Sequence, residues 1–194
     1  MSFLEKWVEE ARRKAAREAV RLVRDGQLIG LGSGRTVSHA IAELGRRVKR
    51  ENLEILCVPS SYQAMLEALE AGLKLTDLYK YPELDLTLDG ADEVDERLNL
   101  VKGGGGALAR EKILASTSKR YVIIVDERKL VKRLGSKNPI PVEVLPFSAP
   151  TVKRKLENLY GKVEYRIGSG KLGPVVTDNG NFILDVYVKP LGKP

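Results

Sequence analysis

Residues 28–44, LIGLGSGRTVSHAIAEL, join a short apolar run to a helical pattern through a glycine-rich turn. The apolar run at 28–31 predicts a buried strand. After the turn, the apolar side chains recur at helical spacing, at Val37, Ala40, Ile41 and Leu44. A strand, a glycine turn and a helix in this order are typical of one half of a βαβ unit, so this stretch predicts an α/β fold.

The same alternation continues on both sides of this stretch. An amphipathic helix is expected to precede it, ending near Asp25 and Gly26. Strands are expected after it at 53–58, 84–88 and 121–125, with helices at 62–71 and 107–116. Alternating strands and helices predict a Rossmann-like, doubly wound, mostly parallel sheet. Ligands bind such sheets at the carboxyl ends of the strands.

The pattern changes after Gly135, where four prolines follow within 16 residues. A helix is expected at 151–159, a strand at 162–166, and a hairpin that joins 175–177 to 182–188 through an Asn-Gly turn. These elements predict a second, smaller α+β domain. We therefore expect a catalytic α/β domain over residues 1–135 and a small domain over residues 136–194.

The composition is that of a globular protein, with 43% apolar and 30% charged residues. No apolar stretch is long enough for a membrane span, and the first 24 residues do not resemble a signal peptide, so we expect a cytoplasmic protein without a membrane partner. The single cysteine, Cys57, excludes an intrachain disulfide and is expected in a buried strand. The single histidine, His39, lies in an expected helix, so a general base is expected to be a carboxylate or a lysine.

The formal net charge is +7, although residues 51–100 alone sum to −9. A basic excess attracts either nucleic acid or small phosphorylated substrates. Because the basic residues are dispersed over helix faces, many of them are expected only to be solvated. We expect no nucleic-acid partner.

The turn Gly32-Ser33-Gly34-Arg35-Thr36 matches neither the dinucleotide fingerprint nor a Walker loop. A glycine turn that opens a helix can present N–H groups and hydroxyls to a phosphate. A plain tight turn between a strand and a helix is the alternative, and the turn alone does not distinguish the two.

A run of four glycines, 103–106, is a stronger signal because ordering it is costly in conformational entropy. A flexible hinge is one interpretation. The other is a site of close approach, since Lys102 precedes the run and Glu111 follows it about one turn into a helix, which is a rigid position for a base.

Asp89 and Asp92 lie three residues apart at the end of an expected strand, and three more acidic residues follow. A hydrated acidic loop and a divalent-metal site are two interpretations, and the pattern does not match an EF-hand. Lys102 argues against a metal because its ammonium would compete with the ion. A carboxylate cluster around a lysine instead favours acid–base work, and with the glycine run it predicts proton transfer on a phosphorylated small molecule.

The chain closely resembles ribose-5-phosphate isomerase of the A type. The resemblance lies in six motifs: GLGSGRT at 30–36, VPSS at 58–61, DGADE at 89–93, KGGGGALAREKI at 102–113, PVEV at 141–144 and VVTDNGNFILDV at 175–186. It implies interconversion of D-ribose 5-phosphate and D-ribulose 5-phosphate in the pentose phosphate pathway. The reaction would pass through an enediolate without a metal or an organic cofactor.

The resemblance also implies residue roles. Glu111 would move a proton between C2 and C1, Asp89 and Asp92 would hold sugar hydroxyls and help to open the furanose ring, and Lys102 would stabilise the enediolate. The residues implied to line the substrate are Ser33, Gly34, Arg35, Thr36, Asp89, Gly90, Ala91, Asp92, Lys102, Gly103, Gly104, Gly105 and Lys129.

Two features depart from the family pattern. Arg35 stands where the family more often has a small hydroxyl residue, and its guanidinium either contacts the phosphate or points to solvent. The chain ends at Pro194, where family members usually continue for a few dozen residues, so we expect the small domain to be incomplete at its C-terminal end. An exposed sheet edge would favour self-association, and a homodimer or homotetramer is expected.

Two rival hypotheses use similar folds. A non-catalytic sugar-phosphate sensor would bind the sugar without turnover and would normally carry a separate DNA-binding segment. An acyl-transferring enzyme would use a glutamate as its nucleophile, and a covalent adduct on Glu111 would identify it.

Overall fold

A computed structural model describes residues 3–191 of the chain. The chain divides into two compact units, the first made of Met1–Gly90 and Ala109–Glu127 and the second of Ala91–Leu108 and Arg128–Pro194. Residues 91–108 and 128–135 belong to the second unit, whereas the sequence placed them in the catalytic domain. The expected boundary between residues 135 and 136 stays a prediction.

The first unit is built on a four-stranded parallel sheet with the strand order β2-β1-β3-β6. Its elements, in chain order, are α1 (Phe3–Val20), β1 (Leu28–Leu31), α2 (Arg35–Glu51), β2 (Leu56–Pro59), α3 (Tyr62–Glu70), β3 (Leu86–Asp89), α4 (Leu108–Thr117) and β6 (Tyr121–Ile123). β1 lies inside the sheet, where Ile29 pairs with Cys57 on one side and with Leu86 on the other. The predicted parallel α/β sheet is confirmed.

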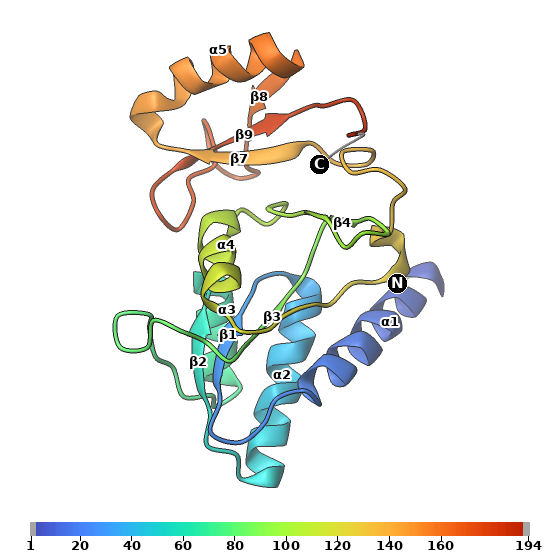
Figure 1. The fold of residues 1–194 in the computed structure, drawn as a ribbon, viewed down its shortest axis with the longest axis vertical. Helices are drawn as coiled ribbons and strands as arrows, with labels where there is room; N and C mark the ends of the chain where they lie inside the picture. The colour runs from blue at the N-terminus through green and yellow to red at the C-terminus, as the bar shows by residue number, and fades with distance from the viewer. Residues whose placement is uncertain (1–2, 192–194) are drawn as a thin grey trace. The chain divides into compact units, whose positions relative to one another are not determined.

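Helices cover both faces of this sheet (Figure 1). Alternate strand residues point to opposite faces. On one face, the buried core joins strand residues to α1, α2 and α3, and its strand members are Ile29, Leu31, Cys57, Leu86 and Leu88. On the other face, Val58 and Leu84 pack with Leu114 of α4. The sheet is therefore doubly wound, as predicted.

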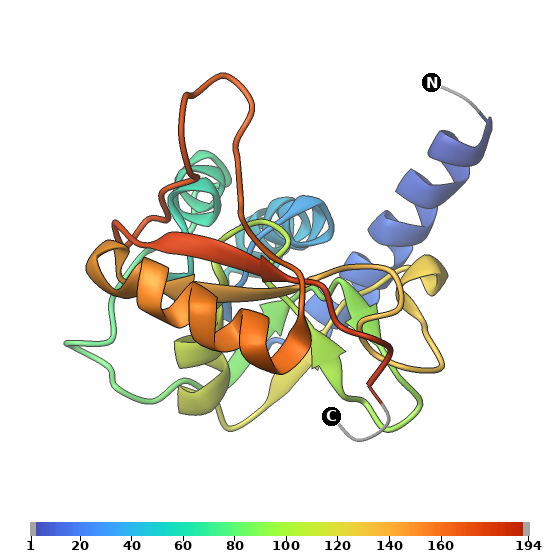
Figure 2. The same ribbon diagram turned by 90° about the horizontal axis from the view of Figure 1, so that it is seen from above.

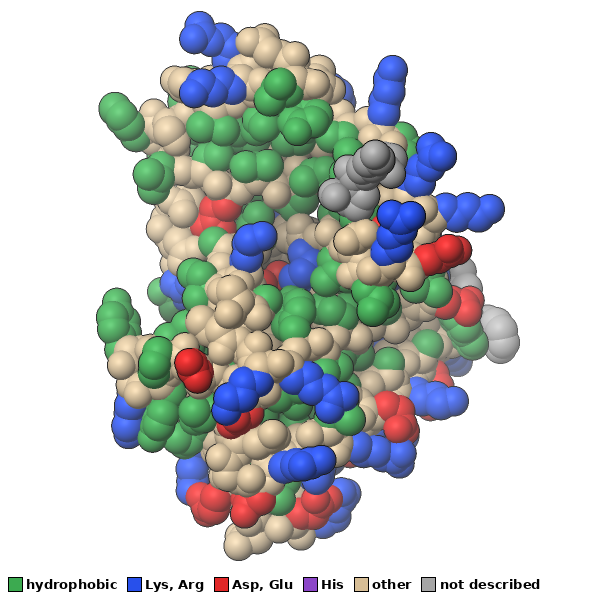
Figure 3. All heavy atoms as spheres, viewed as in Figure 1, with side chains coloured by type: hydrophobic (Ala, Val, Ile, Leu, Met, Phe, Trp, Pro, Cys, Tyr) green, Lys and Arg blue, Asp and Glu red, His purple; other side chains and the backbone are tan. Residues whose placement is uncertain are grey.

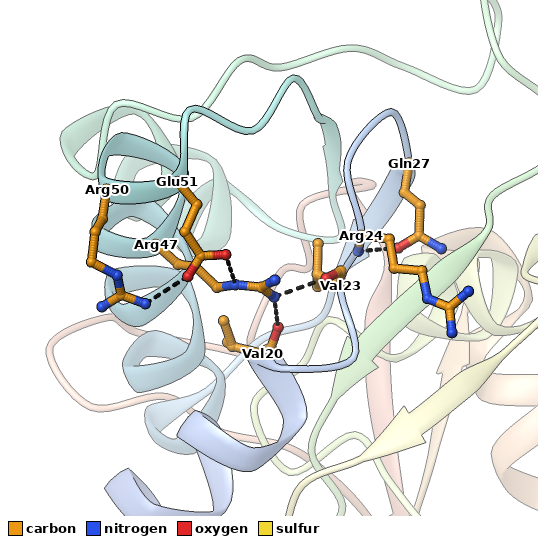
Figure 4. A network of polar contacts seen from close by, with 7 residues as sticks. All are labelled: Val20, Val23, Arg24, Gln27, Arg47, Arg50 and Glu51. Carbon is orange, nitrogen blue, oxygen red and sulfur yellow. Dashed lines mark hydrogen bonds and ion pairs between the residues drawn. The ribbon is translucent and has the colours of Figure 1, made fainter.

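The side chain of Arg47 in α2 donates hydrogen bonds to backbone carbonyl groups at and just beyond the C-terminal end of α1 (Figure 4). Its Nη1 donates to the carbonyl oxygens of Val20 at 2.6 Å and Val23 at 2.8 Å, and its Nε donates to Glu51 at 2.8 Å. A cation beside the last carbonyls of a helix offsets the negative end of the helix dipole. α1 ends at Val20, earlier than expected from the sequence, and the following turn is held by this side chain.

Cys57 and His39 both have structural surroundings. Cys57 is fully buried in β2, and burial raises the pKa of its thiol to about 12, so the thiol stays protonated and unreactive. His39 lies in α2, with Nε2 2.6 Å from Oε1 of Glu9 in α1. Cys57 therefore belongs to the core of the first unit, and His39 connects α2 to α1.

The second unit contains a three-stranded antiparallel sheet with the order β7-β9-β8 and a helix packed on it. Its elements are β4 (Glu93–Val94), β5 (Leu100–Val101), the 3₁₀ turn η1 (Glu127–Lys129, which begins in the first unit), β7 (Ile140–Val144), η2 (Pro146–Ser148), α5 (Ala149–Tyr160), β8 (Val163–Tyr165) and β9 (Phe182–Val186). Figure 2 shows α5 lying along this sheet. The predicted α+β character of the smaller part is confirmed.

Two details of this unit differ from the sequence-based expectation. Ile140–Val144 forms the strand β7, where the prolines indicated a linker. Pro141 is tolerated in this strand because β7 lies at the edge of the sheet, where a residue need not donate a hydrogen bond to a second neighbouring strand. The first arm of the expected hairpin is only a bridge between Val176 and Phe182. Glu143 holds this turn by accepting hydrogen bonds from Thr177, Asn179 and Asn181.

The carboxylate of Glu93 organises the loop before β7. It is fully buried and accepts hydrogen bonds at 2.7 Å from the backbone N–H groups of Gly135, Lys137 and Asn138. Burial raises the pKa of Glu93, but the hydrogen bonds from Lys137, Asn138 and Gly135 outweigh it and hold the pKa below its usual value. The acidic residue after Asp92 is thus an anchor for a loop.

Glu93→Gln is expected to lower the free energy of unfolding at pH 7 by about 1–3 kcal/mol, because an amide cannot accept all of these hydrogen bonds. The native pKa of Glu93 is depressed, so the stabilisation is present above the pKa of the unfolded chain and is lost as pH falls through the native value. Urea unfolding at pH 7 and pH 3 should therefore show the difference from wild type shrinking at the lower pH. Glu96→Gln, an exposed change in the turn that follows β4, is the control. A constant difference at both pH values would contradict this account.

The length of the helices and the distribution of charged side chains are relevant to a membrane or a nucleic-acid partner. Within residues 3–191, no helix is long and apolar enough to cross a membrane. On the face shown in Figure 3, Lys and Arg side chains are scattered among hydrophobic and acidic ones. The expected absence of a nucleic-acid partner stays a prediction.

Candidate active site

The candidate residues fall into two groups, one in each unit. The first unit holds Ser33, Gly34, Arg35, Thr36, Asp89, Gly90 and Glu111. The second unit holds Ala91, Asp92, Lys102, Gly103, Gly104, Gly105 and Lys129. Each group has its own internal geometry.

A cluster of hydroxyls fixes the turn after β1. The Ser33 Oγ lies 2.8 Å from the Ser60 Oγ and donates to the Ser61 Oγ at 2.6 Å. Ser61 is the N-cap of α3, where its Oγ accepts the N–H of Ala64 at 3.1 Å. The carboxyl ends of β1 and β2 are thereby joined through side chains, which makes the position of Ser33 rigid.

The same turn leaves the start of α2 open to an anion. Gly34 is the N-cap residue and has no side chain to cap the helix, and its own N–H donates to the Gln63 Oε1 at 3.3 Å. The N–H groups of a first helical turn, together with the helix dipole, favour a negative charge at this position. Arg35 is exposed and Thr36 is half-buried, so the sequence places a cation and a hydroxyl in the first turn of α2.

Asp89 is held at the end of β3 with no exposed surface. Its Oδ2 accepts a hydrogen bond from the Tyr121 hydroxyl at 2.7 Å, and its Oδ1 accepts the N–H of Gly90 at 2.7 Å. A Cβ at position 32 would lie 2.0 Å from the Asp89 Oδ1 and 2.7 Å from its Cβ. Gly32 is therefore required for this carboxylate to lie against β1.

Glu111 is the second buried carboxylate of the first unit. It is 6% exposed and lies in the first turn of α4, where the helix dipole favours a negative charge. Burial raises the pKa of Tyr121 far above its ordinary value, and the charges of Asp89 and Glu111 raise it further. Both carboxylates thus act electrostatically on one phenol, which stays protonated and can donate to Asp89.

Gly32→Ala is expected to lower the free energy of unfolding by about 1–3 kcal/mol, because the added methyl group overlaps a buried carboxylate that Tyr121 holds in place. Urea denaturation measures this loss. In an Asp89→Gly background, all the Asp89 side-chain atoms that the methyl group would meet, Cβ included, are absent, so the same substitution should cost much less. An equal cost in both backgrounds would show that the contact with Asp89 is not the cause.

The glycine run of the second unit is ordered by side chains. The Asp92 Oδ2 accepts the N–H of Gly104 at 2.7 Å, and a Cβ on Gly104 would lie 2.6 Å from the Asp92 Oδ1. Arg166 donates to the carbonyl oxygens of Gly103 at 2.7 Å and Gly104 at 3.1 Å. The Gly106 N–H closes a turn onto the Gly103 carbonyl at 3.0 Å. Of the two interpretations of this run, these contacts favour close approach.

The remaining candidates of the second unit lie near its surface. Lys102 is half-buried directly after β5, and Gly105 is exposed, with open space around the position of a Cβ. Lys129 is half-buried at the end of η1. Ala91 is half-buried in the connection that follows Gly90. These positions leave Lys102 and Lys129 accessible in part to solvent.

Several residues that support the site were not identified as site residues from the sequence. Ser60 and Ser61 lie in the VPSS motif, which did not mark them as site residues, whereas Tyr121 and Arg166 carry no local signal. Tyr121 reaches Asp89 across 32 residues and Arg166 reaches Gly103 across 63. Partners this far apart are brought together only by the fold.

The part of the chain that the structure describes contains no group of three or more His, Cys, Asp or Glu side chains placed to hold a metal ion. The expectation that the chemistry needs neither a metal nor an organic cofactor stays a prediction.

Comparison with known proteins identifies the family. The family model for ribose 5-phosphate isomerase A (phosphoriboisomerase A) matches residues 56–194. The chain belongs to this family. A ribose-5-phosphate isomerase A from Methanothermobacter thermautotrophicus is 52% identical over 183 residues, which are 94% of this chain and 80% of that protein.

Longer and structurally known members of the ribose 5-phosphate isomerase A family agree with this assignment. The ribose-5-phosphate isomerases of Sus scrofa and Homo sapiens are both 50% identical over 181 residues and 91% of this chain, which spans only 59% and 58% of their lengths. The structure of the Methanocaldococcus jannaschii isomerase matches with a TM-score of 0.91 at 44% identity, covering 95% of this chain and 82% of that one. An isomerase in complex with phospho-erythronic acid matches with a TM-score of 0.93 at 42% identity, covering 96% and 82%. The resemblance and the Rossmann-like fold expected from the sequence are confirmed.

Proposed function

We propose that this chain is an aldose–ketose isomerase that interconverts D-ribose 5-phosphate and D-ribulose 5-phosphate, as a step of the pentose phosphate pathway. The observation that carries the proposal is the placement of Glu111. Its carboxylate is only 6% exposed and lies in the first turn of α4, the helix that follows the ordered glycine run. Membership of the ribose 5-phosphate isomerase A family supports the same reaction.

The chemistry requires a proton to leave one carbon and reach its neighbour. Glu111 takes the proton from C2 of the aldose and returns it to C1, and the charge that forms meanwhile lies on the oxygens of an enediolate. A positioned base of this kind contributes about 10²- to 10⁴-fold. The rigid helical position of Glu111 suits this role, because one carboxylate must face both carbons in turn.

Two carboxylates hold the sugar. Asp89 is fixed by Tyr121 and by the N–H of Gly90, and Asp92 is fixed by the N–H of Gly104. Each is thereby held in one orientation for hydroxyls of the substrate, and together they assist opening of the furanose ring. Lys102 stabilises the negative charge of the enediolate.

The phosphate is expected to bind at the start of α2. The N–H groups after Gly34, the hydroxyls of Ser33 and Thr36 and the cation of Arg35 provide donors there, and Lys129 stays a predicted substrate-binding residue. The related isomerase crystallised with phospho-erythronic acid, a phosphorylated sugar acid, supports this class of ligand. Binding energy from the phosphate then helps to position the reacting end of the sugar.

The test is turnover of ribose 5-phosphate by the purified chain, followed as formation of ribulose 5-phosphate with and without a chelator. We expect turnover at the same rate in both. Binding of ribose 5-phosphate without any turnover would contradict the proposal and favour the sensor, while a covalent adduct on Glu111 would favour acyl transfer. Sedimentation would test the proposed homodimer or homotetramer. The cytoplasmic location is a separate prediction.

A further inference from the structure

Arg166 uses its whole guanidinium on two targets within the second unit. Its Nη1 donates to the carbonyl oxygens of Gly103 and Gly104, at 2.7 and 3.1 Å. Its Nε donates to the Asp185 Oδ2 at 2.9 Å, and its Nη2 donates to the Asp185 Oδ1. One side chain therefore connects β9 to the glycine run.

The pair with Asp185 fixes the direction in which Arg166 points. The two side chains are only 17% and 14% exposed, and the pairing is bidentate. Two parallel hydrogen bonds set the plane of the guanidinium as well as its position, which a single contact would not do. Asp185 lies on β9, the central strand of the three-stranded sheet, so the guanidinium rests on the most supported part of this unit.

The glycine run needs this support more than an ordinary loop does. Ordering one residue costs roughly 1–2 kcal/mol of backbone entropy, and glycine loses more than other residues. Arg166 binds the carbonyl side of Gly103 and Gly104, and Asp92 binds the N–H of Gly104 at 2.7 Å. The peptide that orients the Asp92 carboxylate is therefore itself oriented by Arg166.

We propose that Arg166 is a positioning residue of the isomerase: held by Asp185, it sets the glycine run and, through the N–H of Gly104, the orientation of the Asp92 carboxylate. This inference rests on the proposed function, in which Asp92 holds sugar hydroxyls. It also assigns a task to the second unit, in which Arg166 directly follows β8 and Asp185 lies on β9.

The experiment combines steady-state kinetics with amide hydrogen exchange of the full chain. Arg166→Met removes all the donors and is expected to lower kcat/KM for ribose 5-phosphate about 10- to 100-fold, since small misplacements of substrate-binding groups have effects of this size. Exchange in peptides covering residues 102–108 should be faster by about tenfold or more. Arg166→Lys keeps the charge and a single donor nitrogen without the fork, and should lie between Arg166→Met and wild type. Asp185→Asn should change both readouts in the same direction.

The matched control is Lys162→Met, which removes an exposed ion pair with Glu164 beside the same strand and touches no part of the glycine run. It should leave both readouts at wild-type values. The proposal is overturned if the amides of residues 102–108 exchange at the wild-type rate in Arg166→Met. It is overturned as well if their exchange becomes faster while kcat/KM is unchanged. It is also overturned if exchange rises equally over the whole second unit, because Arg166 would then be a general stabiliser. Absence of turnover in wild type would instead refute the proposed function, while the exchange measurement would still test the contact with the glycine run.

Discussion

Replacing Glu111 with Gln is expected to lower kcat/KM for ribose 5-phosphate by about 10²- to 10⁴-fold while the protein remains folded. The amide has nearly the same shape, so the packing around a side chain that is 6% exposed is kept. It cannot accept a proton from C2, however, and the contributions of binding and charge stabilisation are all that remain. Isomerisation in D₂O provides a second readout, because the variant should also lose exchange of the substrate C2 proton with solvent.

The control for this prediction is Glu18→Gln on the exposed surface of α1, which makes the same chemical change outside the six motifs. It should leave the rate unchanged. A folded Glu111→Gln protein that turns over at the wild-type rate would remove Glu111 from the mechanism. Thermal unfolding of both variants distinguishes this outcome from a loss of structure.

Lys102→Met is expected to lower kcat by about 10²- to 10³-fold, the usual consequence of removing one donor from a developing oxyanion. The thioether side chain keeps most of the apolar stem of the half-buried lysine and removes only its charge and donors. Because the charge of the enediolate exists only along the reaction path, the loss should fall mainly on kcat, with a smaller change in KM. Steady-state kinetics over a range of ribose 5-phosphate concentrations separates the two.

A phosphorylated substrate is also attracted by positive charge at a distance, and this effect needs its own control. Lys132→Met removes the same charge from an exposed position of the second unit. If long-range attraction were the cause, both substitutions would raise KM alike, and added salt would reduce the difference. We expect only Lys102→Met to lower kcat, and equal effects of the two would contradict the assigned role.

The main sheet could be predicted from the sequence because its strands are short apolar runs placed before glycine or hydroxyl turns and helical patterns. β1 was expected at 28–31 and was found there, and α3 and β6 begin at the expected residues. The strand at Ile140–Val144 was missed because prolines argue against a central strand, whereas the fold places this strand at an edge. The two-residue strands Glu93–Val94 and Leu100–Val101 are too short to show a period.

The candidate site was predicted from short motifs. Acidic residues at a strand end, and a lysine and a glutamate on either side of a glycine run, indicated Asp89, Asp92, Lys102 and Glu111, and their roles stay predictions. The groups that hold them could not be found in the same way. Nothing near Arg166 in the sequence distinguishes a guanidinium that binds a glycine carbonyl from one that meets solvent. Likewise Glu93, one residue after Asp92, serves a loop more than 40 positions away.

The contact between Arg47 and the end of α1 bears on how the chain folds as it is synthesised. The carbonyl groups of Val20, at the end of α1, and of Val23, in the turn after it, receive a side-chain donor from Arg47, which lies 27 and 24 positions further along. Until Arg47 has been made and α2 has formed, this donor is missing and the last turn of α1 can fray. We therefore expect the first two helices to become stable together, as one cooperative unit, before the later strands of the sheet are available.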